Sequence, residues 1–316
     1  MIVRWGLDTL PDVLDGPAFF LATERWEPPV EVAGRWSELP YDDLAEVARA
    51  AGEAAVLLAL GGGSTIDTAK GVSATTGSPL VSVPTTYSGA EWTTYFGVRD
   101  PGRRMRGGGA GANLHAIVYE PELTLDLPRE ATVGTALNAL AHAAEALYVR
   151  QRNDEADAHA LEGARLIAES LPRVVASPRD LAARTELLRG AAEAGEALSL
   201  SMLGLGHAIA QALGGRYGLP HGAMNALALP PALRFNARLE PEAVRRFGEA
   251  IGAPEDPAAR VEDLAALGGF GGLRDFGVPE DELGDVAEAA ATRAGNQANP
   301  RPATADEILA LLRSIV

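Results

Sequence analysis

The stretch AAVLLALGGGSTIDTAK, residues 54–70, decides the fold class of this 316-residue chain. Its first seven residues are all apolar, which is typical of a strand buried on both faces of a parallel sheet. Three glycines then permit a tight turn, and a short helix is predicted from Thr65, with its first amide groups available to an anion. The spacing is not a G-x-G-x-x-G fingerprint, because Ile66 takes the third glycine position, and it is not a Walker loop. We interpret the turn as a candidate diphosphate site, with simple packing as the alternative.

Strands and helices alternate on both sides of this turn. A helical pattern covers Asp43–Ala51, and a glycine-rich loop, tight or mobile, is predicted at Gly107–Gly111. Further short strands are predicted at 18–22, 80–83, 95–99 and 115–119. Strands separated by helices indicate a parallel sheet.

After Pro128 the sequence predicts helices only, because Ala, Leu, Glu and Arg dominate and strand-like alternation disappears. The predicted helices are 130–150, 154–170, 180–204, 208–213, 221–234, 241–251, 257–268, 280–292 and 304–315. Asp180 and Thr304 are predicted N-caps. We therefore predict an α/β nucleotide-binding domain over 1–127 and an all-helical domain carrying the catalytic residues over 128–316.

Composition excludes several classes of protein. Asp and Glu number 43 against 27 Lys and Arg, which gives a net charge of −16 and argues against binding to nucleic acid or an anionic membrane surface. The chain has no cysteine, so disulfides, thiolate metal sites and a Cys nucleophile are excluded. No apolar run reaches the ~18 residues that a membrane span needs. Asp8 and Asp12 lie where a signal peptide would have its apolar run. We expect a cytoplasmic protein that acts on a small molecule.

A second strand-to-loop element lies at Leu80–Ser88, where three hydroxyl groups follow the strand at Thr85, Thr86 and Ser88. Ligands of open α/β sheets bind at the carboxyl ends of strands, so the two loops could define one crevice. Ordinary turn chemistry is the alternative. Lys70 is the only lysine of the chain, which indicates either a composition bias toward arginine or a position that tolerates no replacement.

The histidines supply a second set of candidates. The chain has five of them, at positions 115, 142, 159, 207 and 221. Asn138 and His142 are four residues apart on one predicted helix, so they share a face, and Glu145 continues it. His207 and His221 lie at the starts of later predicted helices. Each histidine alone is typical of a satisfied core residue, but these three together favour a site, whereas the other two are predicted to be structural or exposed.

Four segments resemble the iron-containing alcohol dehydrogenase superfamily, in the right order: GGGSTIDTAK (61–70), VPTTYSGAE (83–91), NALAHAAEALY (138–148) and GLGHAIAQALGGRYGLPH (204–221). Within it the chain is most similar to the maleylacetate reductases. That narrower resemblance rests on YEPELTLDLP (119–128), on NPRP (299–302), and on Asn138 in place of a metal-binding aspartate. The similarity covers about residues 54–316.

The resemblance implies an NADH- or NADPH-dependent oxidoreductase with a dinucleotide-binding α/β domain, an all-α domain and a homodimeric assembly. The resemblance implies that the first loop contacts the diphosphate and the nearby sugar of the cofactor. The hydroxyl groups of the second loop would line the nicotinamide end of the cofactor. Glu24 would favour NADH through the ribose hydroxyls, whereas the adjacent Arg25 favours NADPH. The implied cofactor-binding residues are Glu24, Gly61, Gly62, Gly63, Ser64, Asp67, Thr85, Thr86 and Ser88.

The family's metal ligands fall at Asn138, His142, His207 and His221. A neutral amide and three neutral imidazoles leave the charge of a dication uncompensated, so we expect hydride transfer without metal, as the resemblance to maleylacetate reductases implies. An imidazolium would then stabilise the alkoxide and donate the proton, with His207 and His221 as candidates. His142 and Asn138 would position the substrate. The alternative is a metal-dependent alcohol dehydrogenase in which the three histidines retain zinc or iron.

A dicarboxylate substrate also requires local cations. Arg103, Arg104 and Arg106 form the nearest basic cluster, and Arg104 falls about where the family often has a lysine; a solvated loop face is the alternative. The region Arg25–Pro40 is too short for the family's usual helix and second strand before Tyr41. This shortening leaves a third alternative, a non-redox enzyme or ligand-binding protein that has lost dinucleotide binding.

Overall fold

The computed structural model describes residues 1–102 and 104–316, and the chain divides into two compact units. The first unit comprises Met1–Thr86 and Ala90–Asp126, and the second comprises Tyr87–Gly89 and Leu127–Val316. The chain therefore enters the second unit for three residues, returns to the first, and passes into the second again at Leu127.

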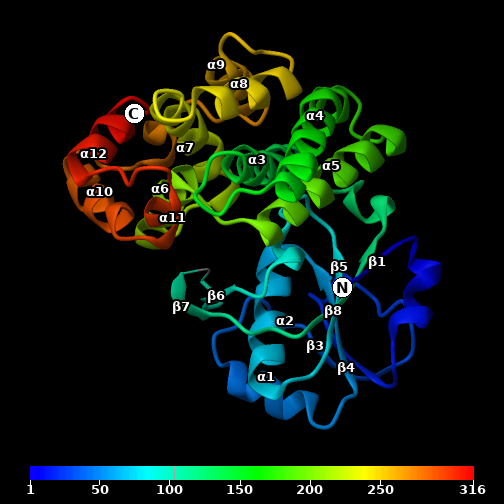
Figure 1. Ribbon diagram of the computed structural model, residues 1–316. Helices are drawn as coiled ribbons and strands as arrows, with labels where there is room; N and C mark the ends of the chain where they lie inside the picture. Colours follow the sequence, from blue (N-terminus) through cyan, green and yellow to red (C-terminus); the bar gives the residue numbers. More distant parts are fainter. Residues whose placement is uncertain (103) are drawn as a thin grey trace. The chain divides into compact units, whose positions relative to one another are not determined.

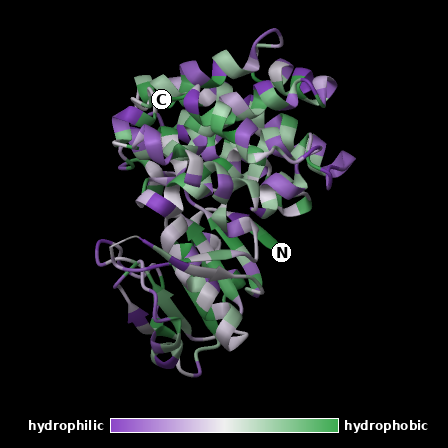
Figure 2. Cartoon of the chain, turned by 90° about the vertical axis from the view of Figure 1, so that its left-hand side faces the viewer, coloured by the Kyte–Doolittle hydropathy of each residue, from purple (hydrophilic) through white to green (hydrophobic). Residues whose placement is uncertain are grey.

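The first unit contains a six-stranded sheet in which every neighbouring pair of strands is parallel (Figure 1). In spatial order its strands are β1 (Ile2–Trp5), β8 (Leu114–Tyr119), β5 (Leu80–Pro84), β4 (Val56–Gly61), β2 (Ala18–Leu21) and β3 (Val32–Trp36). The two apolar runs on either side of the glycine turn form the central strands β4 and β5, and all their residues are buried. The predicted parallel sheet is confirmed, and Figure 2 shows its strands largely in the colour of apolar residues.

The two faces of the sheet are covered differently. On one face, α1 (Leu44–Ala51) and α2 (Gly63–Thr76) pack Val47, Ala69 and Val72 against the strands. On the other face no α-helix of the described residues contributes to the core; the 3₁₀ segment η1 (Leu7–Val13) supplies Leu10 and Val13 instead. The glycine turn leads directly into α2, which begins two residues before the predicted start and runs for 14 residues.

The shortened region 25–40 contains the second strand but not the helix. The parallel strands β2 and β3 are joined by residues 22–31, an irregular connection in which Trp26 packs against the core of the sheet. The Arg35 guanidinium braces this connection by donating to the carbonyl oxygens of Thr23 (3.2 Å) and Trp26 (2.9 Å). The expectation that the strand was also missing is therefore wrong, because a side chain of the second strand itself supports a crossover without a helix.

The glycine-rich segment is not the predicted loop. β6 (Phe96–Arg99) and β7 (Met105–Gly109) form a separate antiparallel hairpin outside the main sheet. The Phe96 ring covers Gly109 so closely that an added Cβ would lie 2.7 Å from the ring, which explains the glycine at this position. The 3₁₀ segments η2 (Ala90–Trp92) and η3 (Pro121–Thr124) complete the unit.

The second unit is helical, as predicted. Its α-helices are α3 (Arg129–Ala146), α4 (Asp154–Ala176), α5 (Leu181–Leu200), α6 (Leu205–Tyr217), α7 (His221–Asn236), α8 (Pro241–Ala250), α9 (Pro257–Ala266), α10 (Leu283–Ala291), α11 (Ala294–Ala298) and α12 (Ala305–Arg313), with 3₁₀ segments η4 (Leu273–Phe276) and η5 (Glu280–Glu282). The predicted caps are confirmed: Asp180 accepts from the Ala183 amide, and Thr304 forms a capping box with Glu307. The short helix α11 was not predicted, and α6 starts three residues early.

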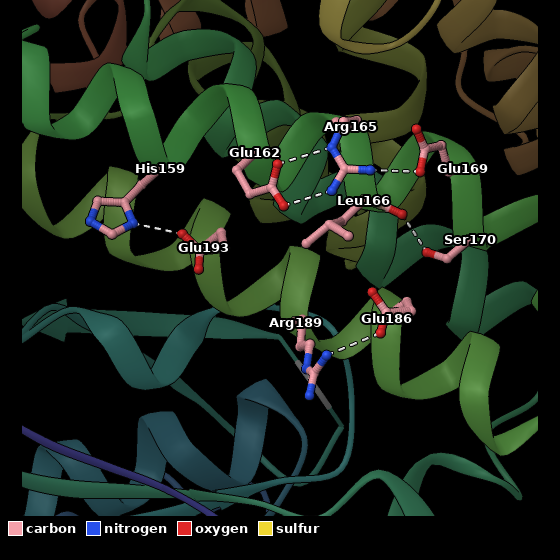
Figure 3. Close-up of polar contacts among 9 residues, drawn as sticks. All are labelled: His159, Glu162, Arg165, Leu166, Glu169, Ser170, Glu186, Arg189 and Glu193. Atoms are coloured by element: carbon pink, nitrogen blue, oxygen red, sulfur yellow. Dashed lines mark hydrogen bonds and ion pairs between the residues drawn. The ribbon is translucent and has the colours of Figure 1, made fainter.

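Helices α4 and α5 form a close antiparallel pair. An added Cβ at Gly163 would lie 2.8 Å from the Ala194 amide nitrogen, so glycine is needed where the two backbones approach. The polar side chains of this pair form local ion pairs, including Arg165 between two glutamates and His159 2.6 Å from Glu193 (Figure 3). His159 therefore has a carboxylate partner on the neighbouring helix α5.

No single helix among the described residues is long and apolar enough to cross a membrane. Together α5 and α6 meet the length and composition criteria, but they are bent by 101° relative to each other.

Candidate active site

Three of the five histidines meet in the second unit. His142 of α3 and His207 of α6 stack with ring centroids 4.7 Å apart, and the ring of His221, the first residue of α7, lies 5.9 Å from that of His207. His142 is 5% exposed and His207 is 1% exposed. The structure thus brings together the histidines that the sequence analysis singled out, and helix termini position two of them.

The first turn of α6 is built around a buried carboxylate. Glu145 of α3 accepts hydrogen bonds from the amide of Gly204 (2.6 Å) and from both the amide (3.0 Å) and Nδ1 (2.6 Å) of His207. The N-cap Gly204 has no side chain, so Glu145 satisfies amide groups that the helix itself leaves unpaired. An added Cβ at Gly204 or Gly206 would lie 3.0 Å from Glu145 atoms. The glycines therefore make room for the carboxylate, which is why the helix begins before the predicted residue.

One ring nitrogen of His207 is available for proton exchange. Because Nδ1 donates to Glu145, the proton-exchanging nitrogen is Nε2, which is buried and has no hydrogen-bond partner among residues 1–102 and 104–316. A buried polar atom without a partner is costly in a folded protein. A carboxylate-supported imidazole with a free Nε2 can donate a proton to an oxygen placed against it.

Two asparagine amides determine the hydrogen-bonding roles of the other two imidazoles. Asn138 donates from Nδ2 to the carbonyl oxygen of Ser88 (2.8 Å), and its Oδ1 accepts from Nδ2 of Asn225 (2.6 Å). Since a carbonyl only accepts, this bond fixes which way the Asn138 amide points, and Asn138 then fixes Asn225. Nδ2 of Asn138 faces Nε2 of His142 (3.4 Å), and Nδ2 of Asn225 faces Nε2 of His221 (3.0 Å). Both of these ring nitrogens are therefore acceptors.

The environment keeps His142 neutral. Burial lowers its pKa well below the ordinary value of 6.5, and the neighbouring imidazoles of His207 and His221 lower it further. This direction agrees with the amide N–H of Asn138 facing its Nε2. The imidazole of His207, in contrast, pairs with the carboxylate of Glu145.

The donor set does not fit a metal ion. Of the four groups that fall at the family's ligand positions, Nε2 of His142, Nε2 of His221 and Oδ1 of Asn138 all face amide N–H groups. Metal ligation requires those lone pairs to converge on one point, with anionic donors to balance the charge. Within the described residues, no group of three or more His, Asp or Glu side chains is arranged to hold a metal ion.

The glycine turn in the first unit does fit a diphosphate. Gly62 is the N-cap of α2 and offers no side-chain cap, so the first amides of the helix are available. An added Cβ at Gly61 would lie 2.6 Å from Thr65 Oγ1, and one at Gly62 would lie 3.0 Å from Thr86, so the turn cannot carry side chains. The Thr85 amide donates to the Gly61 carbonyl (3.0 Å), which brings the two predicted loops side by side. Thr85 Oγ1 is buried and has no partner in the described chain.

Lys70 has a defined structural role beside this turn. Its ammonium is 1% exposed, lies 3.0 Å from Asp67 Oδ1, and donates to the carbonyl oxygens of Ala90 (2.8 Å) and Tyr95. The other Asp67 oxygen accepts from the Gly97 amide (3.2 Å). The pair therefore ties segment 90–97 to α2, and Asp67, expected to face the cofactor, has its charge compensated by Lys70.

Glu24 and Arg25 lie in the exposed turn that follows β2. The Arg25 guanidinium lies 4.6 Å from the centre of the Trp26 ring, a cation–π contact that directs it along the turn. Both residues therefore remain open to a ligand at this edge of the sheet.

Arg104 lies in the exposed hairpin of the first unit. Its amide donates to Asp100 (2.9 Å), and Arg106 pairs with the same carboxylate (2.5 Å), so part of this basic cluster stabilises the hairpin. Arg103, its third member, lies outside the described residues.

Two functional residues were missed or incompletely assigned from the sequence. Glu145 was placed on the face of His142, but not as the partner of an imidazole 62 residues away. Asn225 was not singled out at all. Its signal is the spacing: Asn225 follows His221 by four residues, which mirrors Asn138 and His142 on α3.

The sequence of the chain matches known proteins. Residues 132–316 match the description "Fe-containing alcohol dehydrogenase family, C-terminal", and residues 30–117 match "Iron-containing alcohol dehydrogenase". Maleylacetate reductase from Pseudomonas knackmussii is 38% identical over 275 residues, which cover 87% of this chain and 77% of that protein.

Solved structures of related proteins have a similar fold. A putative alcohol dehydrogenase from Ralstonia eutropha JMP134 has a TM-score of 0.91 at 33% identity, and maleylacetate reductase from Rhizobium sp. strain MTP-10005 has 0.88 at 29%. Each comparison covers 99% of this chain and 95% of the other. The chain therefore belongs to the iron-containing alcohol dehydrogenase family and is an NAD(P)-dependent oxidoreductase.

Proposed function

We propose that this protein transfers a hydride from NADH or NADPH to a small oxo-acid such as maleylacetate, without a metal ion. The observation that carries the proposal is His207, whose Nδ1 donates to a buried carboxylate while its Nε2 is buried and has no hydrogen-bond partner in the described part of the chain. The 38% identity to a protein named maleylacetate reductase supports the substrate class. We further propose that the first unit binds the nucleotide, that the second carries the catalytic residues, and that the enzyme is a cytoplasmic homodimer.

The first unit supplies the residues that would hold the cofactor. The amides at the start of α2, at Gly63 and Ser64, would bind the diphosphate, and the Thr85 hydroxyl would contact the nicotinamide end. When bound, NADH or NADPH supplies the hydride. The Lys70–Asp67 pair keeps a bare carboxylate from facing the diphosphate.

His207 would supply the proton. Hydride addition to a carbonyl carbon, or to an alkene conjugated with it, places negative charge on the carbonyl oxygen. The Nε2–H of a His207 imidazolium would donate to that oxygen, while Glu145 stabilises the imidazolium through Nδ1. His207 and its carboxylate thus replace the Lewis acid that a metal-dependent relative would use.

The neighbouring residues would orient the site. Both amide hydrogens of Asn138 are directed to acceptors and its oxygen accepts from Asn225, so we assign Asn138 to the orientation of the imidazoles rather than to direct substrate binding. His142, neutral and with Nε2 facing an amide, retains Nδ1 as a donor toward a substrate carbonyl or carboxylate. His221 is oriented in the same way by Asn225.

Replacement of the proton donor tests the proposal. We expect His207→Asn to lower kcat with NADH and maleylacetate by a factor on the order of 10²–10⁴, with the Kd for NADH unchanged in calorimetry. Glu145→Gln should lower kcat less, because the imidazole remains. His159→Asn, which changes a surface histidine, is the matched control. A His207→Asn enzyme with the kcat of the wild type would contradict the assignment.

Metal content and nucleotide binding separate the alternatives. Protein purified without a histidine tag should contain far less than one equivalent of zinc or iron, and chelators should leave kcat unchanged. Stoichiometric metal that is needed for activity would overturn the metal-free proposal. Calorimetric titration with NADH and NADPH identifies the preferred nucleotide, and no binding of either would exclude hydride transfer by this chain.

A further inference from the structure

Arg184 of α5 is a buried cation whose hydrogen-bond partners in the described structure are neutral groups. The residue is 1% exposed, and no ion pair joins it to a carboxylate among the described residues. Its Nε donates to the carbonyl oxygen of Pro178 (2.6 Å), and its Nη1 donates to the hydroxyl of Tyr87 (3.1 Å). A fully buried guanidinium is rarely retained without a counter-charge, so these two neutral acceptors define its role.

Tyr87 begins the three-residue segment 87–89 that belongs to the second unit. The amide of Tyr87 donates to Thr135 Oγ1 (3.3 Å), and the carbonyl of the next residue accepts from Asn138 Nδ2 (2.8 Å). The third residue is a glycine with φ +71°, and an added Cβ there would lie 3.3 Å from His142 Nδ1. The segment is therefore held by α3 at its first two residues, by α5 through Arg184, and against a catalytic imidazole at its third.

We infer that Arg184 is a positioning residue which, through Tyr87, holds the Ser88 carbonyl where it fixes the orientation of the Asn138 amide. If that carbonyl moves, the Asn138 amide can rotate and present its oxygen to His142. Asn225 then loses its acceptor and is free to rotate beside His221. The catalytic consequence rests on the proposed function, but the effect on the imidazoles does not.

Arginine is suited to this position by shape. The planar guanidinium presents Nε and Nη1 in fixed relative positions, so one side chain can span the Pro178 carbonyl and the Tyr87 hydroxyl. A lysine has a single terminal nitrogen and cannot reproduce both directions. Arg184→Lys, which preserves the charge, should therefore fail to rescue the wild-type behaviour.

Histidine side-chain NMR tests the inference directly on the protein without ligand. Long-range ¹H–¹⁵N spectra report which nitrogen of each imidazole carries a hydrogen, and the chain has only five histidines to assign. In the wild type we expect Nε2 of His142 to be unprotonated. Tyr87→Phe, which removes one hydroxyl, and Arg184→Met should both shift the signals of His142 and His221 and leave those of His159 unchanged.

Kinetics provide the second measurement. With NADH and maleylacetate, Tyr87→Phe and Arg184→Met should each lower kcat about tenfold, with KM for NADH within about twofold, because the site is misplaced and not removed. The double variant should lose no more than either single variant, since both break one connection. Arg165→Gln, which removes an exposed arginine bound to glutamates on α4 (Figure 3), is the control and should keep the wild-type kcat.

The outcomes are distinct. Unchanged imidazole signals in Tyr87→Phe overturn the inference, and so do additive losses of kcat in the double variant. If Arg184→Met does not fold, Tyr87→Phe alone decides. Shifted signals in a protein whose wild type reduces no oxo-acid would leave the positioning role standing and refute the proposed function.

Discussion

Asn138 and Asn225 determine which ring nitrogens of His142 and His221 accept hydrogen bonds. Each lies four residues from a histidine on its own helix, Asn138 before His142 and Asn225 after His221, so each amide sits beside its imidazole. The first pair was predicted to share a face. The second pair has the same spacing, but its role also depends on a contact with Asn138 on another helix, which the spacing alone does not predict.

Restoring the missing carboxylate should create a metal site. Aspartate at position 138 cannot donate to the Ser88 carbonyl or to His142, so we expect Asn138→Asp to free the Nε2 lone pair of His142 and to supply the anionic ligand. The variant should retain close to one equivalent of zinc after dialysis, as measured by elemental analysis, and the wild type should not. The double variant Asn138→Asp/His207→Asn should lose the metal again. Equal metal content in all three proteins would contradict this account of the donor set.

Glu91 is a buried carboxyl whose ionisation weakens the fold. Burial raises its pKa above 4.5, although the Tyr119 hydroxyl donates to Oε1 (2.8 Å). A group with a raised pKa in the folded state stabilises the protein below pH 4.5, and that contribution is lost as the pH rises through the folded pKa. Glu91→Gln keeps an acceptor for Tyr119 and cannot ionise. We expect its melting temperature to exceed that of the wild type by about 2–4 °C at pH 8, a shift that roughly 1 kcal/mol produces, and to match it near pH 4.

Calorimetry at the two pH values is the measurement for Glu91→Gln. Glu27→Gln, which changes an exposed carboxylate 3.7 Å from the Arg35 guanidinium, controls for the loss of one negative charge. A Glu91 variant that gains nothing at pH 8 would show that the cost of burial is already offset by Lys70 and the local hydrogen bonds.

At the scale of elements, the features set by residues close in the sequence were predictable, and the features set by contacts between distant residues were not. The caps at Asp180 and Thr304 lie within three residues of the amides they bind, so the sequence predicts them. The start of α6 depends on Glu145, about 60 residues earlier, and the strand β3 depends on a brace from Arg35 to a connection without a helix. Sequence reasoning found the glycine turn and the three imidazoles, but not the contacts that orient them.

Lys70 connects α2 to segment 90–97, and substitutions of Lys70 test how much this connection stabilises the fold. Lys70→Met leaves two carbonyl oxygens without their donor and Asp67 without its cation, so we expect a loss of about 2–3 kcal/mol in the free energy of unfolding, measured with urea. Amide exchange at Gly97, which donates to Asp67, should become faster. Asp67→Asn should have the smaller effect, because the carbonyl contacts of Lys70 remain.

Lys70→Arg distinguishes the two explanations for the single lysine. The guanidinium is longer and planar, whereas the buried site surrounds a compact ammonium with acceptors in three directions. We expect this variant to lose about 1–2 kcal/mol, the scale of overpacking in a buried site. Wild-type stability in Lys70→Arg would mean that the lysine is only a remnant of a composition biased toward arginine.

At the scale of the whole molecule, the net charge of −16 acts on the approach of an anionic substrate. Raising the ionic strength from about 0.01 M to about 0.15 M shortens the Debye length from roughly 30 Å to roughly 8 Å, which screens the long-range repulsion of a dicarboxylate. At saturating NADH we therefore expect kcat/KM for maleylacetate to rise about threefold over this range while kcat stays constant. The opposite trend would mean that local cations attract the substrate more strongly than the whole protein repels it. Arg104→Gln would then identify the source: the reversed trend should disappear if Arg104 contacts the substrate, and persist if its hairpin is only a solvated face.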